Sequence, residues 1–373
     1  MEKLYMKTIR SVMFAGAAAG LLAGSAEAVN WKDGFKKGSP ELKSITQLAF
    51  GPEGILFAAD SKSAAVVAID TGDTKEGGAA PIKVENINQK LAALLGTSAD
   101  QIMINDLAVN PISHKPYLSI SRGRGPNALP ALVRVNGSGD LEVVALDQVN
   151  FSRAELPAAP IDRAVPEGGR GGNPRMESIT DIAFLNDRVL VAGLSNEEFA
   201  STFRSIPFPF EKDSDPTSVE IYHGSHGRFE TSAPIRTFVP MKVGDETQLL
   251  AAYTCTPLVE ISLDAIKPSA KVKGKTVAEL GNRNRPLDMI AYRKDGKDYL
   301  LIANSSRGMM KVPTDKLREA EGITEPVRDK KGLSYETLEG VTGVEQLSSF
   351  DTQNALIVRK TDSGQTLEAL PLP

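Results

Sequence analysis

Short apolar runs separated by turn residues recur in a fixed order along most of the chain. A segment that begins with polar residues and continues into an apolar run occurs six times: TQLAF (46–50), NDLAV (105–109), TDIAF (180–184), a weaker IRTFV (235–239), LDMIAY (287–292) and EQLSSF (345–350). Two further apolar runs follow each one, and most units add a more polar fourth run such as IKVENI. Runs this short, rich in Val, Ile, Leu and Tyr and bounded by Gly, Asp, Asn and Pro, predict β-strands.

Four strands repeated at intervals of about 50–75 residues are typical of a β-propeller. We therefore predict an all-β fold, a single β-propeller with six four-stranded blades, with seven blades as the alternative count. The sixth unit lacks a fourth strand, and we expect the N-terminal segment WKDGF…ELKSI, residues 31–45, to supply it and close the ring. A ring left open would expose an unpaired sheet edge. A β-sandwich, or two separate β domains, is the competing fold.

Three segments interrupt this rhythm. NQKLAALLG (88–96) and TDKLREAEG (314–322) predict short helical insertions, the first because its apolar residues are spaced three and four apart. The stretch 147–178 is rich in Pro, Gly and Arg and predicts a long loop between two blades. Loops of this length usually carry function or lack order.

The first 28 residues predict a secretory signal peptide. Lys3, Lys7 and Arg10 precede the apolar run SVMFAGAAAGLLAG, and Ala26 and Ala28 form an A-x-A cleavage site. The propeller domain would then be 29–373. No later segment has the length of a membrane helix, so we expect a periplasmic or secreted protein without an integral membrane segment after cleavage.

Composition narrows the class of partner. The net charge of −4 argues against a nucleic-acid partner. A single cysteine, Cys255, excludes an internal disulfide framework, so burial must hold the chain together.

The blade rhythm resembles that of the six-bladed NHL, SMP-30 (gluconolactonase-like) and TolB-like propellers. The resemblance covers most of residues 29–373 and is a likeness of fold, which does not fix function. It implies that ligands lie near the central channel, on the face that carries the turns between second and third strands and the links from one blade to the next. For the SMP-30 type it implies a divalent ion held by Glu, Asn and Asp, a set that we cannot match here residue by residue.

Arginines gather on the loops predicted for that face. SRGRG and NSSRG are turns between second and third strands, while GNRNRP and the 147–178 stretch link blades. Arginine suits forked recognition of carboxylate or phosphate. The candidate ligand-binding residues are Arg122, Arg124, Arg175, Arg283, Arg285, Asn304 and Arg307. The competing interpretations are that these arginines pair with nearby acids, or that they bind an acidic protein partner.

A second group of polar residues lies at the starts of the inner strands. Asp106, Asp181 and Asp288 would face the channel, and with Glu177 they form a candidate site for Ca²⁺ or another divalent cation. The alternative is that these acids accept hydrogen bonds from main-chain N–H groups of neighbouring blades. HGSH places His223 and His226 three residues apart, but a zinc site needs a third good ligand, so we expect a turn there.

Three functions fit these observations. The first is an exported propeller that binds a small anionic ligand or an acidic partner on its arginine-rich face. The second is an SMP-30-like metal-dependent hydrolase of a lactone or ester. The third is a scaffold subunit of a periplasmic complex. The sequence leaves open whether the protein is an enzyme.

Overall fold

In the computed structural model the chain divides into two units, Met1–Asn30 and Trp31–Pro373. The structure describes residues 29–78, 82–167, 170–211, 215–255 and 257–373. The predicted signal peptide, residues 1–28, lies outside the described residues. None of the described helices is both long and apolar enough to cross a membrane.

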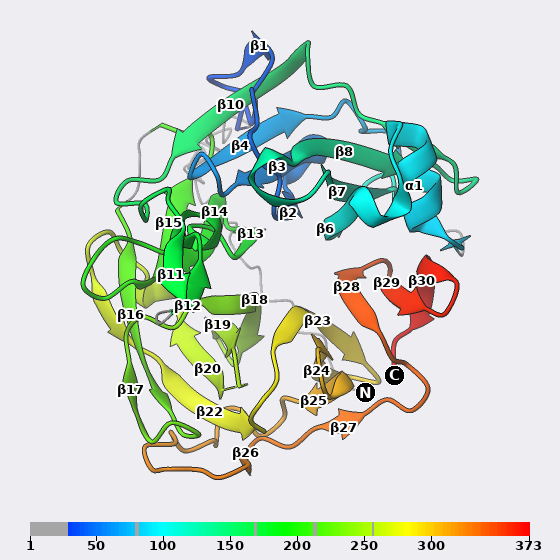
Figure 1. Ribbon diagram of the computed structural model, residues 1–373. Helices are drawn as coiled ribbons and strands as arrows, with labels where there is room; N and C mark the ends of the chain where they lie inside the picture. The colour runs from blue at the N-terminus through cyan, green and yellow to red at the C-terminus, as the bar shows by residue number, and fades with distance from the viewer. Residues whose placement is uncertain (1–28, 79–81, 168–169, 212–214, 256) are drawn as a thin grey trace, which may run out of the picture. The chain divides into compact units, whose positions relative to one another are not determined.

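Six small, mainly antiparallel sheets stand in a ring in the unit Trp31–Pro373, which is a six-bladed β-propeller as predicted (Figure 1). We number the blades by the chain order of their innermost strands. Blade 1 contains β2 (Leu48–Phe50), β3 (Ile55–Asp60), β4 (Ala65–Asp70), β10 (Val149–Glu155) and β1 (Lys36–Gly38). Blade 2 contains β6 (Ile102–Val109), β7 (Pro116–Arg122), β8 (Leu129–Val135) and β9 (Leu141–Val143).

The other four blades follow along the chain. Blade 3 contains β13 (Asp181–Leu185), β14 (Arg188–Leu194), β15 (Ser201–Pro207), β16 (Thr217–His223) and β17 (Arg228–Glu230), with β21 (Lys271–Lys273) added to β16. Blade 4 contains β18 (Ile235–Val243), β19 (Glu246–Tyr253), β20 (Pro257–Ser262), β22 (Lys275–Leu280) and β26 (Lys330–Gly332). Blade 5 contains β23 (Pro286–Lys294), β24 (Lys297–Asn304), β25 (Gly308–Pro313) and β27 (Glu336–Thr337). Blade 6 contains β28 (Val344–Ser349), β29 (Asn354–Thr361), β30 (Gly364–Pro371) and β5 (Lys83–Val84).

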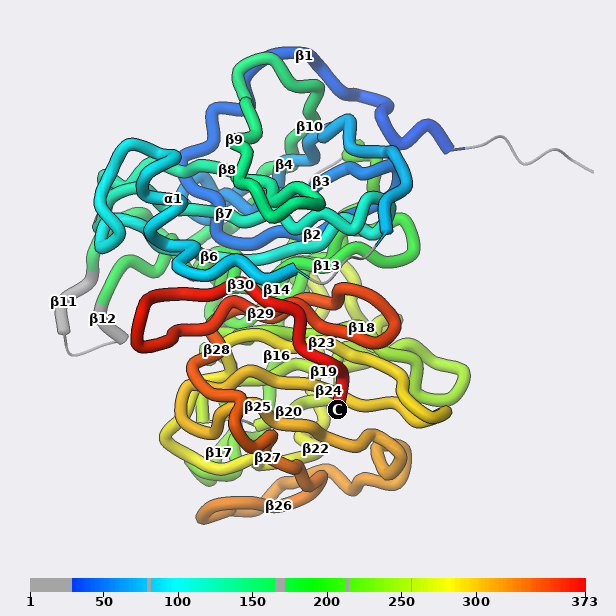
Figure 2. The backbone as a smooth tube through the Cα atoms, turned by 90° about the vertical axis from the view of Figure 1, so that its right-hand side faces the viewer, coloured from blue at the N-terminus to red at the C-terminus, as the bar shows by residue number. Residues whose placement is uncertain are grey.

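The order of the blades around the ring differs from their order along the chain. Blade 1 lies between blades 2 and 3, and blade 2 lies between blades 1 and 6 (Figure 1). Seen from the side, β28–β30 of blade 6 lie between the strands of blade 2 and those of blade 5 (Figure 2). Blade 1 takes its three inner strands from 48–70 and its outer strand β10 from 149–155, so blade 2 is inserted within it in sequence.

Burial of apolar side chains holds each blade to its two neighbours. Six hydrophobic clusters of the described residues lie at the six interfaces between adjacent blades. Leu48 and Leu56 of blade 1 meet Tyr117 of blade 2, for example, and Phe57 of blade 1 meets Ile182 and Val189 of blade 3. Each burial of this kind stabilises the fold by roughly 1.5–3 kcal/mol per large side chain.

The ring is closed by a strand from the N-terminal third of the chain, but the prediction that residues 31–45 supply this strand is wrong. Val84 and Lys83 of β5 pair with Leu367 and Glu368 of β30. The residues 31–45 lie beside blade 1 instead, where β1 pairs with β10. The side chains explain the difference, because Val84 is buried with Leu367 between blades 2 and 6, whereas the two lysines of β1 are exposed.

Two insertions also differ from the sequence-based expectation. The helix predicted near 88–96 is α1 (Ile87–Leu95), but the segment predicted as a second helix forms turns over 315–319. Leu317 is its fully buried anchor, and one apolar residue gives no helical stripe to bury. The predicted loop 147–178 holds β10, the hairpin β11 (Val165–Glu167) and β12 (Arg170–Gly172), and a 3₁₀ turn at Pro174–Glu177.

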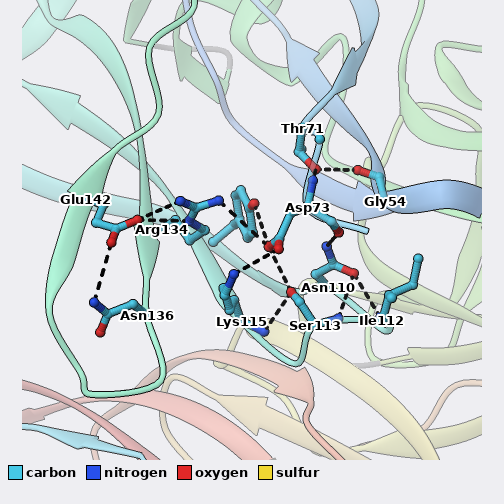
Figure 3. Close-up of polar contacts among 12 residues, drawn as sticks. Gly54, Thr71, Asp73, Asn110, Ile112, Ser113, Lys115, Arg134, Asn136 and Glu142 are labelled. Atoms are coloured by element: carbon cyan, nitrogen blue, oxygen red, sulfur yellow. Dashed lines mark hydrogen bonds and ion pairs between the residues drawn. The ribbon is translucent and has the colours of Figure 1, made fainter. Parts of the chain in front are cut away.

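A polar network fixes the segment after β4 against blade 2 (Figure 3). The buried Asp73 carboxylate accepts hydrogen bonds from Ser113 Oγ (2.8 Å), Lys115 Nζ (2.9 Å) and Tyr117 Oη (3.0 Å). The Asn110 side chain donates to the Asp73 carbonyl at 2.8 Å. Although burial acts to raise the pKa of Asp73, these donors lower it below its ordinary value, so the carboxylate is charged at neutral pH.

Candidate functional site

The inner strands present one polar residue each at the same position, directly before an apolar residue. In order around the ring these residues are Asp106, Gln47, Asp181, Thr237, Asp288 and Gln346. Aspartates therefore alternate with neutral side chains, which gives the channel an approximate threefold repeat of blade pairs.

Each aspartate accepts a main-chain hydrogen bond from the inner strand of the next blade. Leu48 N donates to Asp106 Oδ2 at 2.6 Å, and Phe238 N donates to Asp181 Oδ2 at 2.8 Å. Leu347 N donates to Asp288 Oδ2 at 2.7 Å. These bonds join blades 2 and 1, 3 and 4, and 5 and 6 in the same rotational sense. The sequence-based alternative, in which acids bond to main-chain N–H groups across blades, therefore describes these three side chains.

The three carboxyl groups have raised pKa values. Burial raises the pKa of Asp106 to about 8, and the charge of Asp181 adds to the rise. Burial likewise raises the pKa of Asp181 to about 7. The pKa of Asp288 is well above its usual range because of burial and repulsion from Asp106 and Asp181. Protonated carboxyl groups are poor ligands for a hard cation.

The four candidate metal ligands do not meet at one site, although the three aspartates line the same cavity. Glu177 lies apart from the aspartates in an ion pair with Arg236, with Nη1 and Oε1 2.7 Å apart. Over the described ranges, a group of at least three His, Cys, Asp or Glu ligand atoms within 4.8 Å of one another occurs instead at His223, His226 and Glu230. The third ligand that HGSH lacks in sequence, Glu230, lies on β17, a strand that the blade rhythm does not predict.

Two of the seven candidate ligand-binding residues line a cavity of about 590 Å³ at the end of the channel where the inner strands begin. These are Arg124 and Arg285. Arg124 also donates to the main-chain oxygens of Asp100 and Ile102, at 2.8 and 3.2 Å. We call this cavity the channel mouth.

The other five candidates lie elsewhere or serve the backbone. Arg122 donates to the Leu95 carbonyl at the end of α1, and Arg175 donates to the Pro160 carbonyl in a separate groove beside β10. Arg283 is exposed in the link before β23. Arg307 packs on Gly281 and donates to the Asn282 carbonyl at 3.2 Å. The buried Asn304 accepts from the main-chain N–H groups of Ser306 and Arg307 and so shapes their turn.

Arg236 is a functional candidate that sequence analysis missed. It lies on β18 of blade 4 and lines the channel mouth next to Arg285 of blade 5. Its signal is the weak IRTFV segment: aligned with the other inner strands, Arg236 takes the same position as Asn105, Thr180 and Glu345, which also line the mouth.

Charge at the mouth is only partly compensated. Arg236 is paired with Glu177, but the Arg285 guanidinium forms no hydrogen bond or ion pair with the residues that the structure describes. Burial and the neighbouring positive charge of Arg236 lower the pKa of Arg285, and the carboxylate of Glu177 opposes them. The Thr180 hydroxyl is buried at the same cavity and has no hydrogen-bond partner among the described residues.

The groove beside β10, of about 680 Å³, is also larger than the mouth and is lined by Arg153 and Arg175. Two further cavities, larger still, have a different character. A cavity of about 770 Å³ at the opposite end of the channel is lined by Phe50, Phe184, Phe238 and Phe350, with the three aspartates at its inner end. A cavity of about 860 Å³ lies between β24 and the segment 315–334, on the outside of the ring. Neither one brings arginines together.

Comparisons with known proteins give no family for this chain. No protein-family model matches it, and no curated protein matches it. Among solved structures it is similar to the PQQ-bound aldose sugar dehydrogenase from Streptomyces coelicolor, with 13% identity over 90% of this chain and 96% of that chain and a TM-score of 0.31. It is also similar to the apo-form soluble aldose sugar dehydrogenase from Escherichia coli (10% identity, 91% and 99% coverage, TM-score 0.29). The β-propeller domain of Cps50 (Swd1) from Myceliophteria thermophila gives 13% identity, 88% and 84% coverage and a TM-score of 0.38. No activity is transferred from these proteins to this chain.

Proposed function

We propose that this propeller binds a small anionic molecule, a carboxylate, at the channel mouth beside Arg285 and Arg236. The observation that carries the proposal is the Arg285 guanidinium, which lines the cavity next to another guanidinium and has no acceptor among the described residues. A bound carboxylate would supply two oxygens in the plane that a guanidinium recognises and would offset the repulsion between the two arginines.

The walls of the mouth favour a small polar ligand over a long polyanion. Thr180, Gln47 and Gln346 offer a hydroxyl and two amides for neutral oxygen atoms. Glu345 and the paired Glu177 add negative charge near the rim, which disfavours an extended acidic chain. A carboxylate that also carries hydroxyl groups matches this mixture, and an acidic protein partner matches it less well.

Thermal unfolding of the purified protein with gluconate, citrate or inorganic phosphate as the probe tests the proposal. We expect at least one carboxylate probe to raise the melting temperature, since a ligand that binds only the folded state stabilises it. Replacing Arg285 by Ala should weaken that binding by about tenfold or more, because a hydrogen bond to a charged group contributes about 1.5–3 kcal/mol. Arg236→Ala should act in the same direction.

Arg122→Ala and Arg307→Ala are matched controls, because these arginines were predicted for the same site but bind backbone oxygens away from the mouth. The proposal fails if probe binding survives in Arg285→Ala, or if both controls lose it equally. A protein that co-purifies through Arg285, with no response to any small probe, would support the acidic-partner alternative.

Export is a separate part of the proposal and rests on the N-terminal pattern alone. We expect mass spectrometry of the protein recovered outside the cytoplasm to find a chain that begins at Val29. A chain that keeps residues 1–28 in that fraction, or a protein confined to the cytoplasm, would contradict it.

A further inference from the structure

The hairpin β16–β17 of blade 3 brings two histidines and a glutamate into direct contact. His223 Nδ1 lies 2.9 Å from Glu230 Oε2, and His226 Nδ1 lies 2.8 Å from Glu230 Oε1. The centroids of the two imidazole rings are 3.8 Å apart. The turn between them is tight, with Gly227 at φ +65 donating to the His223 carbonyl at 2.8 Å.

Several buried polar atoms at this turn have no partner among the described residues. His223 is 2% exposed, and its Nε2 is unpaired. Glu279 of β22 in blade 4 is 1% exposed, with Oε1 accepting from Gly224 N at 2.5 Å and Oε2 unpaired. The Ser225 hydroxyl is also unpaired. Buried polar groups are normally satisfied, and an ion bound at this turn would satisfy the free oxygen of Glu279.

We propose that His223, His226 and Glu230 form a binding site for Zn²⁺. Two imidazoles and a carboxylate are a ligand set that Zn²⁺ accepts, and the 44% exposure of His226 gives an ion access from solvent. Glu279, next to the same turn, is the candidate for the fourth ligand.

The observed geometry places all three ligands within reach of one ion, since one ligand atom from each lies within 4.8 Å of the others. In a tetrahedral site with bonds of about 2.0–2.1 Å, ligand atoms lie roughly 3.3 Å apart. The present separations of 2.8 and 2.9 Å belong to hydrogen bonds, so the ligand atoms would move apart by about half an ångström as the metal replaces the shared protons. Arg228 Nε, 3.3 Å from Glu230 Oε1, competes for that oxygen, but its side chain is 72% exposed and can turn into solvent.

The site lies where three segments that are distant in sequence meet. The turn 224–227 contacts Glu279 of blade 4, and Val327 N donates to the Gly224 carbonyl at 2.9 Å. Tyr222, Ile323 and Val327 form a small apolar cluster beside it. With Glu279 as its fourth ligand, an ion bound here would join the outer edge of blade 3 to blade 4, so its expected effect is stabilisation of the fold.

Metal titration of the full chain after treatment with EDTA tests this inference, with Co²⁺ as a visible probe and Zn²⁺ as the competitor. We expect one equivalent of Co²⁺ to give the intense visible absorption of a tetrahedral complex with nitrogen and oxygen ligands. Zn²⁺ should displace it and raise the melting temperature. His226→Ala should weaken binding by about tenfold or more. Since His226 is partly exposed, this variant should stay folded, which circular dichroism checks.

His114→Ala is the matched control. It removes the chain's third histidine, which lines the cavity of about 770 Å³ at the end of the channel opposite the mouth, away from the β16–β17 hairpin. Glu230→Gln keeps the size of the side chain and should also lose the Co²⁺ absorption. The inference is overturned if wild-type protein gives no such absorption, if His226→Ala and Glu230→Gln both bind as the wild type does, or if His114→Ala loses binding to the same extent.

Discussion

The aspartates of the channel illustrate how a single residue can serve the fold at a cost. Each one accepts a main-chain N–H from the next blade, which satisfies a buried donor. The same burial opposes ionisation, and repulsion from neighbouring acids adds to it at Asp106 and Asp288, so the carboxyl groups keep protons at pH values where an exposed aspartate would have lost them.

Asp106→Asn should therefore stabilise the protein at alkaline pH. The pKa of Asp106 is about 3.8 in the unfolded chain and about 8 in the folded state. Between these two pH values the folded protein binds more protons than the unfolded chain, so stability falls as pH rises. The amide can still accept from Leu48 N but carries no charge to bury. We expect its free energy of unfolding at pH 8 to exceed that of the wild type by several kcal/mol, at about 1.4 kcal/mol for each pH unit crossed, with the difference vanishing toward pH 4.

Urea unfolding at several pH values measures this difference. Asp362→Asn, in the exposed turn between β29 and β30, is the control and should not gain stability as pH rises. A difference between Asp106→Asn and the wild type that is the same at pH 4 and pH 8 would show that ionisation of this carboxyl group does not affect stability.

At the residue scale, the sequence correctly predicts that arginines line the channel mouth, but it identifies only some of the individual arginines that do so. Runs such as GNRNRP indicate arginines on the loops of one face, and Arg285 and Arg124 do line the channel mouth. The direction in which a loop side chain points depends on the geometry of the turn, and this geometry cannot be predicted from the sequence pattern. Arg307 is an example: it occupies the kind of turn where a ligand contact was predicted, but its side chain packs against Gly281.

At the scale of elements, the inner three strands of each blade can be predicted from the sequence because they are buried on both faces and therefore form apolar runs. Strands at the outer edges carry a weaker signal. β17 has the sequence RFE and β1 has KKG, and neither shows the apolar run by which the other strands were found. The metal-ligand candidate Glu230 lies on one of these strands, which is why HGSH alone predicts only a turn.

The outer strand of blade 1 shows a related limit. β10 has the sequence VNFSRAE, and it pairs with β4, which ends about 80 residues earlier in the chain. Strand pairing over such a separation leaves no local pattern, so the stretch 147–178 was predicted as one long loop. The same long-range pairing puts blade 2 between blades 1 and 6, an order that the rhythm of repeats cannot reveal.

At the scale of the whole molecule, the ring makes every blade depend on two neighbours. Each of the six apolar clusters belongs to two blades, so loss of one interface leaves the next blade with an uncovered face. The two-residue strand β5 is the point where the last blade is completed, with Ile82 and Val84 buried against Leu367 in the cluster between blades 2 and 6. A closed ring of this kind should unfold as one cooperative unit.

Val84→Ala tests that cooperativity because the only tryptophan lies at a different interface. Trp31 packs against Phe184 and Phe208 between blades 1 and 3, whereas Val84 lies between blades 2 and 6. Removing two buried methyl groups should lower the free energy of unfolding by about 2 kcal/mol. Val143→Ala, which truncates a valine that is 50% exposed on β9, should change it by less than about 0.5 kcal/mol. If the ring unfolds as one unit, Val84→Ala shifts the tryptophan fluorescence transition in urea to the same lower midpoint as the circular dichroism transition. A fluorescence midpoint that stays at the wild-type value while circular dichroism shifts would mean that blades 1 and 3 hold together after the ring has opened at blade 6.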